Sequence, residues 1–180
     1  MRIISGEWGG RRIDPPGHMP HTRPTTDMAK GGLFNILQHR IDLSGLKTLD
    51  LFGGTGAISY ELASRGATDL TIVEKDPTMA DFIHRTADKL GIGGLKLVRS
   101  DVFLFLRTCR EHFGFIFAGP PYALGNIDEL PGLACGLLEP GGWFVLEHTP
   151  RNQYKGHPFF REERSYGTTV FSFFIRDSSE

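Results

Sequence analysis

Strand-like and helix-like segments alternate from Leu46 onward, and this alternation constrains the fold more than any other feature. The strand-like segments are short and apolar, and glycine or proline marks most helix ends. The predicted strands are residues 47–52, 70–74, 95–99, 115–118 and 143–147, and the predicted helices are 56–65, 77–90, 102–110 and 128–138. Repeated strand–helix units form a doubly wound sheet of parallel strands. The sequence therefore predicts an α/β fold.

The two ends of the chain carry hairpin patterns instead. Residues 159–163 and 169–175 flank Tyr166-Gly167 and predict an antiparallel hairpin that brings the sheet to seven strands. Phe171 and Phe173 share one face of this hairpin, which favours core packing over a platform for stacking RNA bases.

At the N-terminus, residues 1–5 and 8–13 predict a small β-hairpin. A connector rich in Pro, Gly and His follows, and Thr25-Thr26-Asp27 can cap a helix despite Gly31-Gly32 inside it. Each of these glycines should weaken that helix by roughly 1 kcal/mol relative to alanine. The expected parts are residues 1–24, a hairpin and connector, and residues 25–180, the main domain.

Charge, the spacing of cysteine and histidine, and the pattern of apolar residues argue against a globally basic, a metal-binding and a membrane-spanning protein. The net charge is −1, so no global basic signature marks nucleic-acid binding, although residues 1–40 carry six Lys or Arg against three acids. Cys109, Cys135 and the seven histidines lack metal-ligand spacing, so no metal is expected. The sequence shows no signal peptide and no membrane span. We expect a cytoplasmic protein with two buried thiols.

The segment from Asp50 to Gly56 runs from a strand into a glycine-rich turn and then a helix. Such a turn lets a ligand approach the backbone and the helix N–H groups closely, although a tight turn without a ligand is the alternative. The dinucleotide fingerprint is incomplete, because Ser59 stands at its last position. Asp50 beside the turn disfavours a pyrophosphate and suits a cationic amino group. This favours S-adenosylmethionine (SAM) over NAD.

Two more acids stand at strand ends: Glu74 ends one predicted strand, and Asp101 follows another. Glu74 lies twenty positions after Gly54, where an acid accepts hydrogen bonds from ribose hydroxyls. Glu74 or Asp76 could instead cap the next helix. Asp101 fits recognition of an adenine amine, and an ordinary N-cap is its alternative.

The strand at 115–118 runs into Gly119 and then Pro120-Pro121-Tyr122. Two prolines make a stiff loop and leave carbonyl groups free beside an aromatic ring. In an open α/β sheet, ligands bind at the carboxyl ends of the strands. The loop can therefore hold a flat group that bears an exocyclic amine.

These motifs together resemble class I SAM-dependent methyltransferases, specifically the RsmD type, which methylates the exocyclic N2 of one guanine in 16S ribosomal RNA. The resemblance covers nearly the whole chain and implies a Rossmann-like fold. It rests on the glycine turn and on residues 1–6, Arg11-Arg12, Arg23-Pro24-Thr25-Thr26-Asp27, residues 33–37, 64–67 and 73–75, and Pro120-Pro121-Tyr122.

The resemblance also implies roles for individual residues. Cofactor binding falls to Thr25, Thr26, Asp50, Phe52, Gly54, Gly56, Glu74, Lys75, Asp101 and Val102. The catalytic loop is Gly119, Pro120, Pro121 and Tyr122, and RNA contact falls to Arg2, Arg11, Arg12 and Arg23. The implied partner is 16S rRNA within the small ribosomal subunit or an assembly intermediate. A monomer without metal or membrane partner is expected.

The chain departs from the family pattern at Gly119, where Asp is usual, and also at Gly31, Gly53 and Gly114. The missing carboxylate normally accepts a hydrogen bond from the target amine, so we predict SAM binding with weak or altered turnover. The alternatives are another Pro-Pro-Tyr amino methyltransferase, acting on adenine N6 or a protein amide, and a SAM- or RNA-binding homologue without catalysis. An NAD-dependent oxidoreductase would leave the proline loop unexplained.

Overall fold

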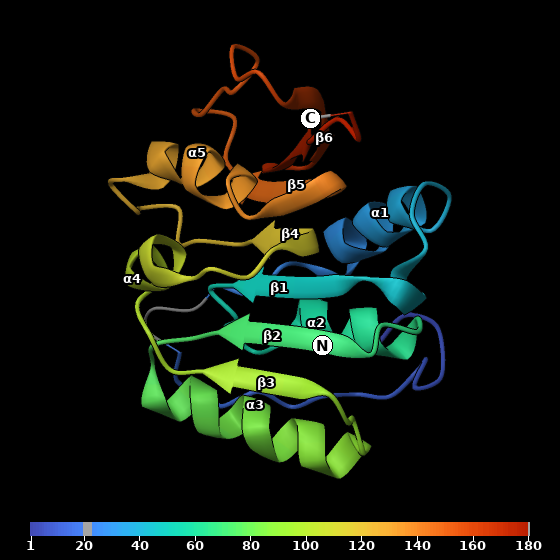
Figure 1. Cartoon of the computed structure of the whole chain (residues 1–180). Coiled ribbons are helices and arrows are strands. Elements are labelled where there is room, and N and C mark those ends of the chain that lie inside the picture. The colour runs from blue at the N-terminus through green and yellow to red at the C-terminus, as the bar shows by residue number, and fades with distance from the viewer. Residues whose placement is uncertain (20–22, 180) are drawn as a thin grey trace.

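A computed structural model describes residues 1–19 and 23–179 and contains a seven-stranded sheet (Figure 1). Five strands run parallel, and the last two are antiparallel to their neighbours. The spatial order is β3-β2-β1-β4-β5-β7-β6. The strands are β1 (Lys47–Leu51), β2 (Asp69–Val73), β3 (Leu95–Val98), β4 (Phe113–Ala118), β5 (Leu138–His148), β6 (Phe160–Tyr166) and β7 (Thr169–Ile175). The predicted doubly wound sheet with a C-terminal antiparallel hairpin is confirmed.

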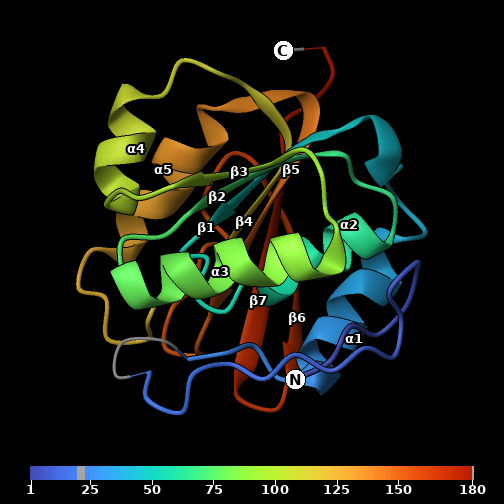
Figure 2. The same ribbon diagram turned by 90° about the horizontal axis from the view of Figure 1, so that it is seen from below.

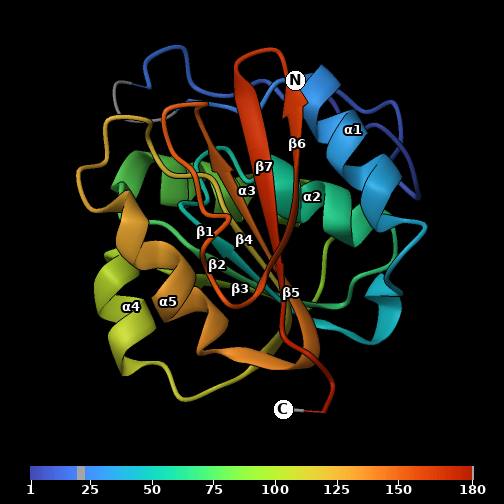
Figure 3. The ribbon, with the colours of Figure 1, turned by 90° about the horizontal axis from the view of Figure 1, so that it is seen from above.

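Helices cover both faces of the sheet, as Figures 2 and 3 show. Their bounds are α1 (Asp27–Leu37), α2 (Ala57–Ser64), α3 (Pro77–Leu90), α4 (Val102–Thr108) and α5 (Leu130–Cys135). Leu49 and Leu51 of β1 pack with α4 and α5, whereas Phe115 and Phe117 of β4 pack with α1 and α2. Among the described residues, none of the helices is long and apolar enough to cross a membrane.

The region before β5 differs from the prediction. The helix predicted over 128–138 is a 3-10 turn, Ile127–Glu129, followed by the short α5. Pro140-Gly141-Gly142, between the predicted helix 128–138 and the predicted strand 143–147, lies inside β5, where the pairing with β4 shifts register. The reason is pairing across the sheet, because Gly141 N donates to Arg176 O at 2.7 Å and Arg176 N donates to Gly142 O at 3.0 Å.

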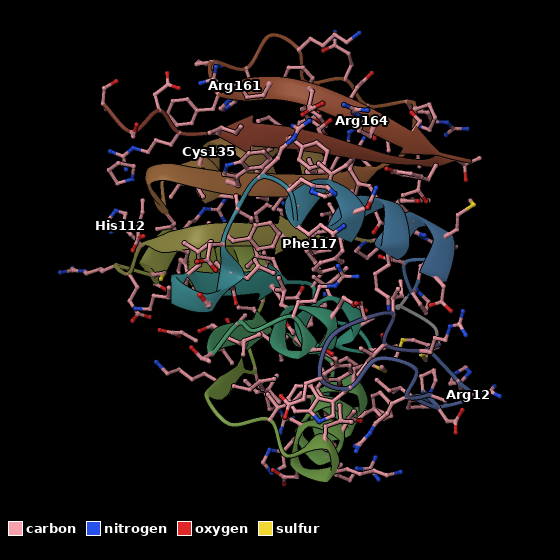
Figure 4. All side chains as sticks on the ribbon, turned by 90° about the vertical axis from the view of Figure 1, so that its right-hand side faces the viewer. Arg12, His112, Phe117, Cys135, Arg161 and Arg164 are labelled. Atoms are coloured by element: carbon pink, nitrogen blue, oxygen red, sulfur yellow. The ribbon has the colours of Figure 1, made fainter. Side chains whose placement is uncertain are left out.

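The N-terminal segment forms less strand than predicted. Its two arms run antiparallel, with Ile3 N donating to Arg11 O, but Arg2 and Arg12 form only an isolated bridge. The segment is nevertheless fixed to α2, because Glu61 accepts hydrogen bonds from Ile4 N and Ser5 N at 2.8 and 3.1 Å. Figure 4 shows Arg12 on this segment at the edge of the molecule. Residues 20–22 of the predicted connector lie outside the described residues.

The two cysteines differ in exposure. Cys135 is buried in α5, and burial raises the pKa of its thiol to about 12. Cys109, at the C-terminus of α4, is only half-buried. The prediction of two buried thiols was therefore wrong for Cys109, because α4 is short and ends at the surface.

The two glycines of α1 have different surroundings, which predicts opposite effects of alanine. A Cβ at Gly32 would lie 2.2 Å from the ring of Tyr166, whereas a Cβ at Gly31 would make an ordinary contact with Ile4 at 3.5 Å. We expect Gly31→Ala to stabilise the protein by up to about 1 kcal/mol through helix propensity. We expect Gly32→Ala to destabilise it by about 1–3 kcal/mol through overpacking.

Urea denaturation of both variants and the wild type measures the difference. Because both substitutions change the same helix in the same way, Gly31→Ala is the matched control for Gly32→Ala. Equal free energies of unfolding for the two variants would contradict the assigned packing of Tyr166 against α1.

Candidate functional site

A cavity of about 660 Å³ lies at the carboxyl ends of β1, β2 and β4. In Figure 1 this is the edge at which the arrowheads of β1, β2 and β3 point. The predicted site residues that line it are Arg23, Thr25, Asp50, Phe52, Gly54, Glu74, Lys75, Asp101, Val102, Gly119 and Pro121. Of the residues assigned to the cofactor and to the catalytic loop, four do not line it: Thr26, Gly56, Pro120 and Tyr122. The fold therefore brings together most of the predicted cofactor site.

The glycine turn is held from the neighbouring strand by Glu74. Gly54 N donates to Glu74 Oε1 at 2.7 Å, and Asp76 N donates to Glu74 Oε2 at 2.8 Å. Phe52, Gly54 and Gly56 all have positive φ, so the chain turns sharply before α2. Each carboxylate oxygen can accept a second hydrogen bond, so Glu74 can position the turn and still contact a ligand.

Asp50 is a buried acid that lines the cavity. Its side chain accepts a hydrogen bond from Ser59 Oγ at 2.8 Å, and the residue is 3% exposed. Burial raises the pKa of this carboxyl to about 7, and the nearby charge of Glu74 adds to the effect. In residues 1–19 and 23–179, no cationic side chain pairs with it. The site is suited to a ligand that brings a positive charge.

Two predicted site residues also cap helices. Asp101 Oδ1 accepts from Leu104 N at 3.1 Å at the start of α4, and the side chain still lines the cavity. Thr26 Oγ1 accepts from Ala29 N at 3.2 Å at the start of α1. The N-cap is thus present at Asp101, with its second oxygen left for a ligand, whereas Thr26 supports the site from outside the cavity.

Another buried carboxylate, Glu147 near the end of β5, was not predicted from the sequence. Its oxygens accept hydrogen bonds from Arg23 Nη2 and Thr25 Oγ1, each at 2.5 Å. The Arg23 guanidinium also lies over the ring of Tyr122, 3.5 Å from the centroid. One signal could have revealed Glu147, because it ends a predicted strand as Glu74 does.

The arginines expected to contact RNA occupy separate places. Arg23 lines the main cavity, whereas Arg11 and Arg12 line a second groove of about 460 Å³ between the N-terminal segment and α3. Arg85 and Lys89 of α3 line this groove too, and the sequence analysis did not single them out. Arg2 faces Arg12 across the isolated bridge.

The doubly wound sheet, the glycine turn and the acids at successive strand ends define a Rossmann-like fold of the class I methyltransferase kind. The described residues contain no cluster of His, Cys, Asp or Glu suited to a metal ion. The chain belongs to the family described as Conserved hypothetical protein 95, whose sequence model matches residues 1–175. The resemblance to RsmD-type enzymes is thereby confirmed.

Relatives support this membership. The chain is 33% identical over 147 residues to ribosomal RNA small subunit methyltransferase D of Escherichia coli K12, covering 82% of this chain and 71% of the relative. It is 31% identical over 153 residues to the enzyme of the same name from Haemophilus influenzae, covering 82% and 78%. The chain is thus a homologue of ribosomal RNA methyltransferases.

Solved structures agree with the fold. A hypothetical protein from Thermus thermophilus is 30% identical with a TM-score of 0.84, over 97% of this chain and 98% of that one. The 16S rRNA N2 G1207 methyltransferase RsmC from T. thermophilus, in complex with AdoMet and guanosine, is 24% identical with a TM-score of 0.71. That match covers 84% of this chain and 44% of RsmC and shows a shared fold.

The raised pKa of Asp50 predicts a pH-dependent stability difference between the wild type and Asp50→Asn. The folded value is about 7 against 3.8 for an ordinary aspartate, so the wild type loses stability as pH rises from about 4 to 7. The loss is at most about 1.4 kcal/mol per pH unit. Asp50→Asn has no carboxyl at this position, so its free energy of unfolding should rise relative to that of the wild type across this pH range.

Urea denaturation of both proteins without cofactor, at pH 5 and pH 8, measures the difference in their free energies of unfolding. The account requires a larger stability advantage for Asp50→Asn at pH 8. A gap that is the same at both pH values would show that Asp50 does not titrate in this window.

Proposed function

We propose that this protein transfers a methyl group from SAM to the exocyclic N2 of a guanine in 16S rRNA, within the small ribosomal subunit or an assembly intermediate. One observation carries the proposal: Asp50, Glu74 and Asp101 share a single cavity with the strand end at Gly119, in a homologue of small-subunit rRNA methyltransferases. Acids at three strand ends suit a cofactor with an ammonium, a ribose and an adenine.

The residues of the cavity fit SAM. Asp50 offers a buried carboxylate to the ammonium, Glu74 offers two oxygens to the ribose hydroxyls, and Asp101 offers one to the adenine amine. When bound, SAM supplies an electrophilic methyl group on a sulfonium. The remaining residues assigned to the cofactor are Thr25, Thr26, Phe52, Gly54, Gly56, Lys75 and Val102. Of these, Thr26 and Gly56 act by shaping the backbone, since neither lines the cavity.

The protein's contribution to methyl transfer is mainly the placement of the target amine. The nucleophile must lie about 3 Å from the methyl carbon, in line with the bond that breaks. A guanine base must leave its stack to reach this position. Gly119-Pro120-Pro121 then presents carbonyl oxygens to the amine, and Tyr122 presents its ring to the base. Acceptors for the amine N–H groups help, because the N2 lone pair is delocalised into the ring.

The second groove supports contact with RNA by residues 1–24. Arg11, Arg12, Arg85 and Lys89 line it with a single acid, Asp14, although the net charge of the whole chain is −1. Such a local concentration of cations can neutralise backbone phosphates. We assign this groove, with Arg2 beside it and Arg23 at the main cavity, to the ribosomal RNA.

Isothermal titration with SAM, followed by transfer of tritiated methyl groups to immature small subunits, tests the proposed function. We expect SAM binding and label in 16S rRNA as N2-methylguanosine. Label in N6-methyladenosine or in protein would favour the other amino methyltransferases. Binding of SAM and RNA without any transfer would favour a homologue that has lost catalysis, which the absence of a side chain at Gly119 makes the second candidate.

The groove predicts a change in the salt dependence of RNA binding. Each phosphate contact contributes about one unit to the slope of log affinity against log salt, so Arg12→Ala and Arg85→Ala should each flatten the slope by about 1. Filter binding of 16S rRNA fragments across a range of salt concentrations measures it.

Arg107→Ala is the matched control, because Arg107 does not line the groove and lies on α4, which packs on the opposite face of the sheet from α2. A flattening that is equal in all three variants would contradict the assignment of the groove. So would an unchanged slope in Arg12→Ala and Arg85→Ala.

A further inference from the structure

We infer that Glu147 is the carboxylate that accepts a hydrogen bond from the target amine, and that Arg23 occupies the place of the target base in the free protein. The inference rests on the proposed function, because it takes the target to be a flat base with an exocyclic amine. It assigns a catalytic role to a residue outside every motif singled out from the sequence.

Glu147 lies beside Gly119 on the adjacent strand. Ala118 of β4 and Leu146 of β5 are partners in a parallel pair, so the next residues, Gly119 and Glu147, lie side by side. A Cβ at position 119 would lie 3.6 Å from Glu147 Oε1. The carboxylate of Glu147 thus reaches, from the adjacent strand, the space that a side chain at 119 would enter.

The carboxylate of Glu147 is buried and hydrogen-bonded. The Glu147 side chain is 1% exposed, and a buried charge of this kind requires partners. Arg23 and Thr25 supply one hydrogen bond to each oxygen. A carboxylate can accept about four hydrogen bonds, so capacity remains for the N–H of an amine. Thr25 can stay in place when Arg23 leaves, because the two donors bind different oxygens.

Arg23 contacts both Tyr122 and Glu147. Its planar guanidinium lies 3.5 Å from the centroid of the Tyr122 ring, while its Nη2 donates to Glu147. A flipped guanine would use the same two contacts, with its ring on Tyr122 and its amine on Glu147. The Arg23 side chain is 37% exposed, so it can swing outward into solvent or onto an RNA phosphate. Arg23 therefore covers the Tyr122 ring and pairs with the Glu147 carboxylate until the base displaces it.

If Glu147 accepts the hydrogen bond from the target amine, methyl transfer does not require an acid at position 119. An aspartate there would bring a second negative charge close to Glu147, and its Cβ would also lie 3.1 Å from the Phe117 ring. Gly119→Asp should therefore fail to accelerate methyl transfer, whereas a site that lacks its acid would gain from it.

Single-turnover methyl transfer to immature small subunits tests the role of Glu147. Removal of one preorganised polar group typically costs about 10²–10³ in rate, so Glu147→Gln should lower the rate about 100-fold with SAM affinity unchanged. Glu139→Gln is the matched control, because Glu139 is an exposed residue of the same strand. Glu147→Gln within threefold of wild type, or Gly119→Asp faster than wild type, would overturn the assignment.

Equilibrium dialysis with labelled guanosine tests the place of Arg23 without turnover, in the presence of the demethylated cofactor product. We expect Arg23→Ala to bind free guanosine at least threefold more tightly than wild type, although its affinity for RNA falls. Glu147→Gln should bind guanosine more weakly. Unchanged or weaker guanosine binding by Arg23→Ala would overturn the inference that Arg23 occupies the base position.

The two measurements also separate this inference from the proposed function. If the wild type methylates no RNA, the proposed function fails, and guanosine binding by Arg23→Ala still decides whether Arg23 blocks a base site. If Glu147→Gln does not fold, shown by loss of SAM binding, the Arg23→Ala and Gly119→Asp results decide the outcome. If the wild type is active and Glu147→Gln is equally active, only the further inference fails.

Discussion

Parallel hydrogen bonding between β1, β2, β4 and β5 is the constraint on which the rest of the site depends. Leu51 of β1 is the register partner of both Val73 and Ala118, and Ala118 is in turn the partner of Leu146. The residues after these partners therefore emerge at one edge of the sheet, although they are far apart in sequence. A slip of one residue in β1 would turn Asp50 toward the apolar layer of α4 and α5.

Buried charge is used in two ways in this structure. Lys30 and Glu61 are almost fully buried, and they fix the N-terminal segment, since Lys30 Nζ donates to Arg2 O at 2.7 Å. Asp50 has no cationic partner among the described residues, so burial is the main cause of its raised pKa. Glu147 has a cationic partner that is partly exposed and can leave. Asp50 lines the cavity, and Glu147 is bonded to Arg23 and Thr25, which line it. The pair of Lys30 and Glu61 lies beneath the N-terminal segment.

Much of the fold could be predicted from the sequence, because each strand–helix unit carries local signals. Pro77 and Gly91 bound α3 as expected, and the glycine turn ends β1. The sequence did not reveal β5 in full, since Pro140-Gly141-Gly142 resembles a turn locally, and its backbone pairs with the distant Arg176. The N-terminal segment likewise makes further hydrogen bonds to Glu61 and Ser64 of α2, which no local pattern shows.

In the candidate site too, some residues can be found from the sequence, whereas other contacts appear only in the folded chain. The acids at the ends of β1 and β2 and the acid before α4 could be found because each stands next to a recognisable strand or helix boundary. The contact between Arg23 and Glu147 could not, because 124 positions separate the two residues and only the tertiary fold joins them. The loop at Gly119 carries no acid of its own. In the folded chain, Glu147 of the neighbouring strand β5 places a carboxylate beside Gly119.

We propose that this chain methylates a guanine N2 in small-subunit RNA. Mass spectrometry of 16S rRNA from cells that lack the gene tests it most directly. The account predicts the loss of one N2-methylguanosine, which returns when the wild-type gene is restored. An unchanged set of N2-methylguanosines in the 16S rRNA of those cells would contradict it.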